Sequence, residues 1–586
     1  MSKLLKYLRL LLLCGPLRAL SRVLLHGWSV LTLVVSVGVG YVPSAQAEIE
    51  DMPASSDVAP LVHGSNATLL VRQFLLEGVV ERASAGITLA RLDASIHELH
   101  NIQGVQLTVL DIHHIADALT RIYHNAGYPF TKVIVPAQEI IEGRVTLQVV
   151  EPTVGSIHVR GGSSYDQAQM ESAFSSVIGE VVNAKEVETL VRRVNGFPGL
   201  STFSYFSKGA KPNTTRINIK IQKEVSWQVL AKVDNYGVET TGQTRGLTSF
   251  TLNNPLGFAD QLSLGIMQSV GAEEEENTTY GSFFYRAPLF HSAFSVGLLA
   301  SNNQFDIGRE FADLGLQGEA SIARADLRYL WSSSRSLSGS VMVYGDAKRS
   351  ELQSELNTDV LDKEETSNGS GLLLTVNYRG EGSPLQQKLF IDIYTGDYEI
   401  EYGEDAAIVA AEDSFVKSQV RYQLRWDWLS LYSQIQWDIR AQHSDVALPS
   451  IEQISASGPY AIRGLETGFY SSDNGAITSL QWRFMHPSWL GDTVSKGVSG
   501  MFVPFVFYDA AVLERIATEN EQLTVSGAGV GVDYSISISD SLRVFGRLTV
   551  AATDNIEQRN TETDEINMTI DPEQQHAVYG EINVQF

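Results

Sequence analysis

The feature that most constrains this chain is a period-two alternation of apolar and polar side chains that recurs through its C-terminal part. In residues 421–428 the apolar positions are Tyr422, Leu424, Trp426 and Trp428, and the polar positions between them are Arg421, Gln423, Arg425 and Asp427. Such alternation places one face of a strand in an apolar medium and the other in water. Segments of roughly 10 residues are longer than the ~5–6 residues of most soluble strands, and they favour a transmembrane β-barrel with lipid outside and a wet lumen inside.

Sixteen segments with this pattern follow one another from residue 225 to the end of the chain. A closed antiparallel bacterial barrel requires an even number of strands. We therefore predict a β-barrel of about 16 antiparallel strands over residues 225–586. The segments are 225–236, 243–253, 260–270, 278–288, 293–301, 316–331, 337–347, 369–378, 386–396, 414–428, 429–443, 475–486, 501–512, 524–535, 541–551 and 576–586.

Polar clusters separate several of these segments. Acidic and small polar residues concentrate at 273–277, 350–370 and 553–573, which we interpret as solvated surface loops. The chain stops on Phe586 at the end of a strand pattern, and bacterial outer-membrane barrels typically show a terminal aromatic residue to their assembly machinery. These features indicate outer-membrane lipid as the surrounding medium and the barrel-assembly machinery as a partner during biogenesis.

The first 47 residues have the composition of a secretory signal peptide. They hold five basic residues, no acidic residue, an apolar run from Trp28 to Val42 and the small-residue site Ala45-Gln46-Ala47, which predicts cleavage before Glu48. The competing interpretation is a membrane anchor, but the run has only about 15 residues and a spanning helix needs ~20. We therefore expect an exported protein.

Charge and cysteine usage limit the functions of the mature chain. Removal of the signal peptide takes five positive charges away and changes the formal net charge from −25 to −30. Such an acidic protein is not expected to bind nucleic acid. The single cysteine, Cys14, lies inside the signal peptide, and Leu13 before it argues against a lipoprotein site. A mature chain without thiols has no disulfide and no cysteine metal site.

Two similar units precede the barrel. The first, residues 71–152, reads as a strand at 71–79, two helical stretches of which the second spans 108–125, and two strands at 128–136 and 143–151. The second, residues 153–224, begins with a strand at 155–161, runs through a helix to a turn at 195–200, and ends in a strand at 215–221. The order strand, helix, helix, strand, strand is that of a POTRA module, a small α+β periplasmic domain.

Short motifs along the mature chain resemble those of one family. The loop Ser457-Gly458-Pro459-Tyr460-Ala461-Ile462-Arg463-Gly464 resembles the sixth-loop signature of the POTRA-bearing outer-membrane barrels, specifically the two-partner secretion transporters that export haemolysins and filamentous haemagglutinins. Further matches are turn residues in the same order: Ala126-Gly127-Tyr128, Val135 to Gln138, Asn195-x-x-Pro198-Gly199, Asp234-Asn235-Tyr236-Gly237, Asn254-Pro255-Leu256-Gly257 and Tyr285-Arg286-Ala287-Pro288-Leu289.

The resemblance implies a salt bridge inside the barrel. In the family the sixth loop folds back into the lumen, and its arginine pairs with an aspartate on the inner wall. Carried over, this assigns Arg463, Gly464 and Asp509, with Gly458, Pro459, Tyr460, Ile462 and Leu465 supporting the loop tip. The chain has Leu465 where the family usually has an aromatic residue, Ile462 for valine and Ala511 for glycine. The alternative that Arg463 and Asp509 are solvated separately stays open.

The resemblance also implies a function. A translocation pore would recognise a secreted partner exoprotein through its periplasmic POTRA domains and export it across the outer membrane without ATP. The alternatives are an assembly or insertase barrel of the same superfamily and a passive porin. Whether the client is a haemolysin, an adhesin or a growth-inhibiting toxin stays open. The family often carries a plug helix and a linker before its modules, which places both in residues 48–70, although this segment is rich in Ser, Ala and Pro.

Catalytic patterns are missing from the sequence. It holds 12 histidines, but His113 and His114 are adjacent and point to different faces of a helix, so they cannot easily chelate one metal. The sequence has no phosphate-binding loop, nucleophile elbow or dinucleotide fingerprint. We therefore expect no enzyme activity, no cofactor and no metal site.

Overall fold

The computed structural model describes most of the chain after residue 67. The described residues are 68–99, 105–162, 164–271, 276–289, 293–332, 336–354, 362–380, 382–402, 410–485, 490–495, 498–516, 521–539, 542–560, 566–569 and 576–586. The predicted signal peptide and almost all of the predicted 48–70 segment, with its plug helix, lie outside these residues. The chain divides into two compact units, of which one ends at Glu224 and the other runs from Val225 to Phe586.

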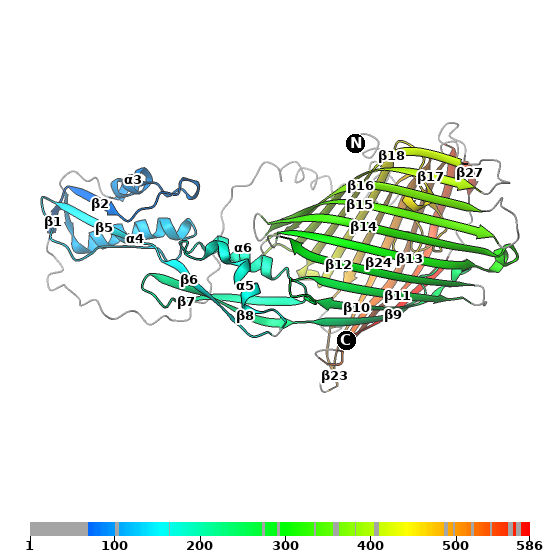
Figure 1. Cartoon of the computed structure of the whole chain (residues 1–586), viewed down its shortest axis with the longest axis horizontal. Coiled ribbons are helices and arrows are strands. Elements are labelled where there is room, and N and C mark those ends of the chain that lie inside the picture. Colours follow the sequence, from blue (N-terminus) through cyan, green and yellow to red (C-terminus); the bar gives the residue numbers. More distant parts are fainter. Residues whose placement is uncertain are drawn as a thin grey trace. The chain divides into compact units, whose positions relative to one another are not determined.

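The first POTRA module is a three-stranded sheet covered by two helices (Figure 1). Its elements are β1 Thr68–Val71, β2 Gln73–Glu77, α3 Leu89–Leu99, β3 Val105–Thr108, α4 Val109–Asn125, β4 Lys132–Ile134 and β5 Arg144–Val150. The sheet order is β2-β5-β4, with β2 parallel and β4 antiparallel to β5. The predicted strand at 71–79 is in fact β1 and β2, and β1 pairs with β3, a strand that the sequence analysis missed.

Local sequence explains the limits of α4. Thr108 accepts a hydrogen bond from the backbone N–H of Asp111, whose carboxylate accepts one from the N–H of Thr108, which is a capping box. The helix stops before Gly127, which has φ +100°. Its apolar face packs into the core of the module, where burial raises the pKa of Tyr123 to about 12. None of the helices in the described parts of the chain is long and apolar enough to span a membrane.

The second module has the order strand, helix, helix, strand, strand. These elements are β6 Thr153–Arg160, α5 Gln167–Ala173, α6 Ala184–Val194, β7 Leu200–Lys208 and β8 Thr214–Glu224, with the sheet order β6-β8-β7. The turn at Asn195 is fastened by its side chain, which accepts a hydrogen bond from Thr202 N (2.5 Å) and donates one to Thr202 O (3.1 Å). The sequence analysis expected one helix and missed α5 as a separate helix and β7.

The second unit is a closed barrel of sixteen antiparallel strands among the described residues, as predicted. The strands of the wall are β9 Trp227–Asp234, β10 Thr244–Asn253, β11 Gln261–Val270, β12 Asn277–Leu289, β13 Phe294–Ile307, β14 Leu316–Ser332, β15 Leu337–Ser354, β16 Lys363–Arg379, β17 Leu385–Tyr402, β18 Ala410–Trp428, β19 Ser433–Ser444, β22 Asn474–Phe484, β24 Val498–Arg515, β25 Glu521–Ser537, β26 Arg543–Asn560 and β28 His576–Gln585. Two short strands, β23 Leu490–Ser495 and β27 Ile566–Thr569, pair with one end of β24 and of β26.

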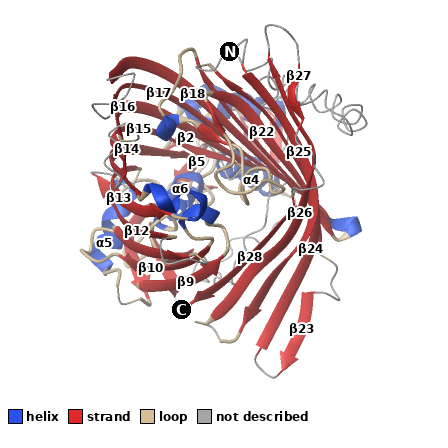
Figure 2. Cartoon of the chain, turned by 90° about the vertical axis from the view of Figure 1, so that its right-hand side faces the viewer, coloured by secondary structure: helices blue, strands red, loops and turns tan. Residues whose placement is uncertain are grey.

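Closure follows from pairing of the first and last strands. β28 pairs with β9 over five residues, from Glu581 opposite Asp234 to Gln585 opposite Leu230 (Figure 2). The side chain of Asn235 extends this seam, because it donates to Val578 O (2.7 Å) and accepts from Gly580 N (2.7 Å). A closed ring leaves no unpaired strand edge, which a membrane interior does not tolerate.

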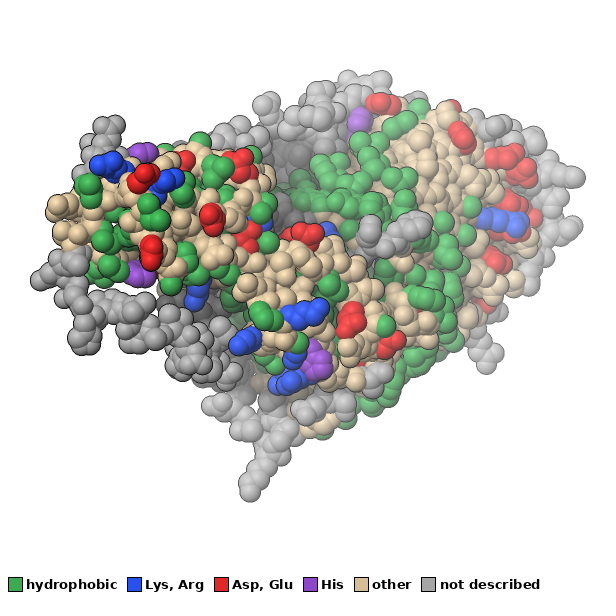
Figure 3. Space-filling view, turned by 60° about the vertical axis from the view of Figure 1, so that its left-hand side comes forward, with side chains coloured by type: hydrophobic (Ala, Val, Ile, Leu, Met, Phe, Trp, Pro, Cys, Tyr) green, Lys and Arg blue, Asp and Glu red, His purple; other side chains and the backbone are tan. Residues whose placement is uncertain are grey.

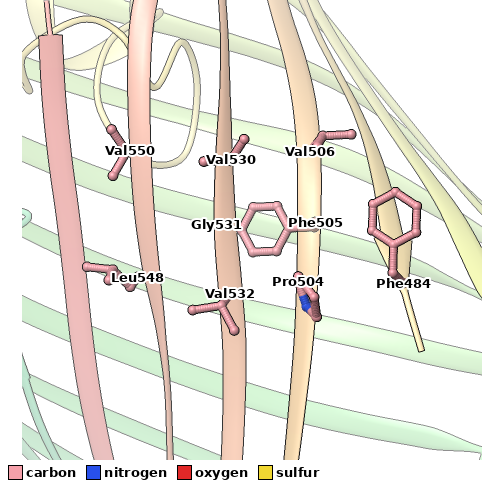
Figure 4. Close-up of a pocket in the computed structure, with 9 residues that line it drawn as sticks. All are labelled: Phe484, Pro504, Phe505, Val506, Val530, Gly531, Val532, Leu548 and Val550. Carbon is pink, nitrogen blue, oxygen red and sulfur yellow. The ribbon is translucent and has the colours of Figure 1, made fainter. Parts of the chain in front are cut away.

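The two faces of the wall differ as the alternation predicts. On the outer face Ile266, Val343 and Val578 are 68%, 55% and 56% exposed, and Figure 3 shows hydrophobic side chains gathered over the outside of the barrel. The inner face carries ion pairs, among them Arg286–Asp326 at 2.9 Å and Arg547–Asp533 at 2.6 Å. An apolar depression of about 410 Å³ lies on β22, β24, β25 and β26 and is lined by residues such as Pro504, Val530 and Leu548 (Figure 4).

Several strands are longer than predicted. β15 continues to Ser354 and β16 begins at Lys363, so the predicted loop at 350–370 is wrong at both ends. β26 likewise runs to Asn560, into the predicted loop at 553–573, and β12 begins at Asn277. In these extensions polar side chains occupy both faces, so the ladder of hydrogen bonds continues where the alternation of hydropathy stops.

The closed ring predicts how the protein behaves in detergent. The mature protein should fractionate with the outer membrane and migrate faster in a gel when unheated than after boiling, because SDS does not open a closed hydrogen-bonded barrel without heat. The boiled half of each sample is the control. Recovery in the soluble periplasmic fraction, or one mobility at all temperatures, would contradict the barrel.

Candidate functional site

The candidate site lies on the connection between β19 and β22, residues 445–473, which we call the inner loop. It contains a 3₁₀ turn at Ser450–Glu452 and two short strands that pair antiparallel, β20 Ile454–Ser455 and β21 Ser471–Ser472. Nearly half of its residues are buried, among them the run 461–465, in which Arg463 is 5% exposed. A connection this long and this buried lies against the barrel wall and not in bulk solvent.

Arg463 makes a two-pronged ion pair with Asp509 of β24. Its Nη2 lies 2.7 Å from Asp509 Oδ1 and its Nε lies 2.8 Å from Oδ2, while its backbone N–H donates to Oδ2 at 3.2 Å. The guanidinium also donates to neighbours on β22, from Nη1 to Gln481 Oε1 at 3.1 Å and from Nη2 to Ser479 Oγ at 2.8 Å. Paired, planar contacts of this kind are the strongest that an arginine makes with a carboxylate.

The position of Asp509 follows from the period of its strand. Phe505, Phe507 and Asp509 are 1%, 5% and 0% exposed, whereas Val506 between them is 40% exposed on the outer face. The three residues thus share the lumen side of β24. The Arg463 guanidinium carbon lies 3.3 Å from the centre of the Phe507 ring, so the cation is also held over an aromatic face.

Apolar packing supports the loop tip. Ile462 and Leu465 are fully buried in a cluster that includes Ala456 of the loop, Ala511 of β24 and Val525 of β25. The departures from the family pattern therefore fall in one place: Ile462, Leu465 and Ala511 are all part of this cluster. Leu465 contacts the wall through its backbone as well, because its carbonyl accepts a hydrogen bond from Tyr579 Oη at 2.7 Å.

Two positions of the motif require glycine, each for a different structural reason. Gly464 lies so close to β26 that a Cβ would stand 2.4 Å from Thr553 Oγ1 and 2.7 Å from its backbone nitrogen. Gly458 has φ +91°, a conformation that favours glycine, and a Cβ there would meet Thr467 Oγ1 at 2.8 Å. Substitution at Gly464 would therefore push the loop off the wall, whereas substitution at Gly458 would strain the turn.

Tyr460, which the resemblance assigns to support of the loop tip, lies outside the buried cluster of Ile462 and Leu465. It is 67% exposed, and its neighbour Pro459 is only half-buried. The Tyr460 ring stands edge-on to Tyr236 at 5.6 Å, and its hydroxyl accepts a hydrogen bond from Lys232 Nζ at 3.4 Å. Tyr460 thus contacts β9 and the residues that follow it.

Several contributing residues were missed. Ser479 and Gln481 hold the guanidinium, and Tyr579 of β28 holds the loop backbone. Alternation on β22 could have placed Ser479 and Gln481 on the lumen face, but nothing local connects them with Arg463. Among the described residues, no group of His, Cys, Asp and Glu side chains is arranged to hold a metal ion.

POTRA modules followed by a membrane barrel with a loop fixed in its lumen define a POTRA-bearing outer-membrane barrel. The family model for the haemolysin secretion/activation protein ShlB/FhaC/HecB matches residues 213–534, and the model for the ShlB-type POTRA domain matches residues 79–152. The first match covers more than half of the 586 residues. The chain therefore belongs to the haemolysin secretion/activation family, and it is an outer-membrane protein of the two-partner secretion type.

Individual relatives agree with this assignment. The chain is 25% identical over 230 residues to the heme/hemopexin transporter protein HuxB of Haemophilus influenzae, which is 39% of this chain and 40% of HuxB. It is 25% identical over 187 residues, or 32% of the chain and 30% of the relative, to the outer membrane transporter CdiB-2 of Burkholderia pseudomallei. The structure of CdiB from Escherichia coli has a similar fold, with a TM-score of 0.67 at 16% identity over 93% of this chain and 94% of CdiB.

The buried pair predicts strong coupling between its two members. Arg463→Ala and Asp509→Ala should each lower the temperature at which the barrel loses its SDS-resistant form, because removal of one buried partner costs roughly 3–5 kcal/mol and less in a partly wet lumen. The double variant should cost less than the sum of the two, with a coupling of ~0.5–3 kcal/mol. Heat-shift gels on all four proteins measure the cycle.

A matched control lies on the same wall. Arg421 and Asp438 also form a lumen pair, but their side chains are 48% and 26% exposed. Their alanine cycle should show a coupling near ~0–1 kcal/mol, as for solvated ion pairs. Additive losses at Arg463 and Asp509, equal to those of the control, would mean that the pair is not a unit.

Proposed function

We propose that this protein exports a secreted partner protein across the outer membrane. In this proposal the POTRA modules recognise the partner in the periplasm, and the barrel lumen is its path to the outside. The observation that carries the proposal is the inner loop, which is fixed inside the lumen by Arg463 and Asp509 in a chain that matches the family model over the barrel. A passive porin needs neither POTRA modules nor such a loop.

Edge strands of the modules offer a way to bind an extended segment. β7 lies at an edge of its sheet, which runs β6-β8-β7, and nine residues of it are extended. Phe203 and Tyr205 project from it, 48% and 38% exposed, with ring centres 5.9 Å apart. An added strand gains main-chain hydrogen bonds from such an edge and apolar contact from alternate side chains. This mode needs little sequence specificity, which suits a long client.

Energy for export would come from the client. The periplasm contains no ATP, and the sequence shows no phosphate-binding loop. Client folding outside the cell, together with release from the modules, would make the passage directional. In the resting state the Arg463–Asp509 pair would hold the inner loop in the lumen in the arrangement that export requires.

Deletion of residues 71–151 should abolish export of the partner and leave the barrel inserted. The first module has its own core, and the barrel is a separate compact unit, so the deletion removes recognition without opening the ring. Export is measured as partner in the culture medium, and the heat-shift gel shows in the same cells that the barrel is folded. Normal export by the shortened chain would overturn the role of this module. Loss of other outer-membrane proteins instead would favour the alternative, a barrel-assembly function.

A further inference from the structure

Besides the ion pair of Arg463, a carboxylate of the inner loop itself holds the loop to the wall. No sequence motif indicated this residue. Glu452 ends the first turn of the loop, and its side chain is completely buried. Its Oε1 lies 2.5 Å from Lys348 Nζ of β15, and its Oε2 lies 2.5 Å from Lys417 Nζ of β18. Ser367 of β16 donates a third hydrogen bond to Oε1 at 2.8 Å. One loop side chain thus joins three wall strands.

The barrel wall presents two lysine side chains at the place where Glu452 binds. Lys348 and Lys417 lie 4.6 and 5.3 Å from the centre of the same Tyr394 ring, which faces both cations. The nearest wall carboxylate, Asp346, lies 3.6 Å from Lys348, but it also binds Arg324 at 2.6 Å and accepts from the Tyr394 hydroxyl at 2.6 Å. Asp346 is therefore shared, whereas the loop carboxylate of Glu452 contacts both lysines directly.

The surroundings of Glu452 favour its anionic form. Burial opposes its ionisation, but the attraction of Lys417 and the hydrogen bonds from Lys348 outweigh burial and hold the pKa of Glu452 below its usual range. The backbone is tied at the same place, because Gln442 Nε2 donates to Glu452 O at 3.1 Å and to Asp473 O at 3.0 Å. Gln442 thereby joins the beginning and the end of the inner loop.

We propose that Glu452 is a second positioning residue of the loop, which anchors its base to β15, β16 and β18 while Arg463 anchors its tip to β24. The proposal rests on the proposed function, in which the position of this loop matters for export. It has a consequence of its own: loss of either anchor loosens the segment between them, and loss of both anchors loosens it further.

The test measures how accessible the inner loop is to a soluble reagent in the purified protein. Ala456 lies between the two anchors and is fully buried, and the predicted mature chain has no other thiol, so Ala456→Cys reports exposure of the loop through its rate of reaction with a soluble maleimide. In this background Glu452→Gln should speed labelling on the order of tenfold, since it breaks a buried ion pair. Combination with Asp509→Ala should speed it further than either change alone.

Two more variants separate anchoring from general damage. Glu466→Gln removes the same charge from an exposed position of the same loop and should leave the labelling rate unchanged. Glu452→Gln with Lys417→Gln should restore part of the protection, because only Lys348 then lacks the loop carboxylate, and Asp346 lies 3.6 Å from its Nζ. Fast labelling in the parent, equal rates for Glu452→Gln and Glu466→Gln, or no recovery in the charge-neutral pair would each overturn the proposal. No client is present in this assay, so it can succeed or fail independently of export.

Discussion

Every backbone N–H and C=O group of a strand in lipid must find a partner in another strand, and this requirement determines the rest of the structure. It closes β9 onto β28 and forces one face of all strands towards a common lumen. Side chains in that lumen are shielded from lipid and lie close to one another, so charged residues there form pairs such as Arg547–Asp533. The ring thus creates an interior in which a buried, charged loop is stable.

The inner loop uses this interior at several points. Its tip contacts β22 and β24 through Arg463, its base contacts β15, β16 and β18 through Glu452, and its backbone reaches β28 through Leu465. Each contact joins the loop to a different part of the wall, including a strand of the closing seam. Apolar packing around Ile462 stabilises the loop against the wall. The ion pairs of Arg463 and Glu452 determine where the loop lies, because buried charges tolerate few alternative partners.

Sequence reasoning succeeded where one physical contrast dominates. All sixteen wall strands were predicted because lipid and water differ strongly across each strand. Their ends were missed because the contrast vanishes beyond the membrane, and β7 was missed because Phe203 and Phe206 make both of its faces apolar. The pairing of Arg463 with Asp509 came from resemblance. Glu452 had no signal, since its lysine partners lie 104 and 35 residues away in the chain and no local pattern connects them.

The central claim is that the client passes through the lumen of this barrel. Adjacent residues of β18 test it: Gln423 points into the lumen, where it donates to Asp438 at 2.7 Å, and Leu424 is on the lipid side. A photo-crosslinking amino acid at each position, in cells that are secreting the partner, should capture the partner from position 423 and not from 424. Export that continues with no crosslink from position 423, or with equal crosslinks from both positions, would contradict a path through the lumen.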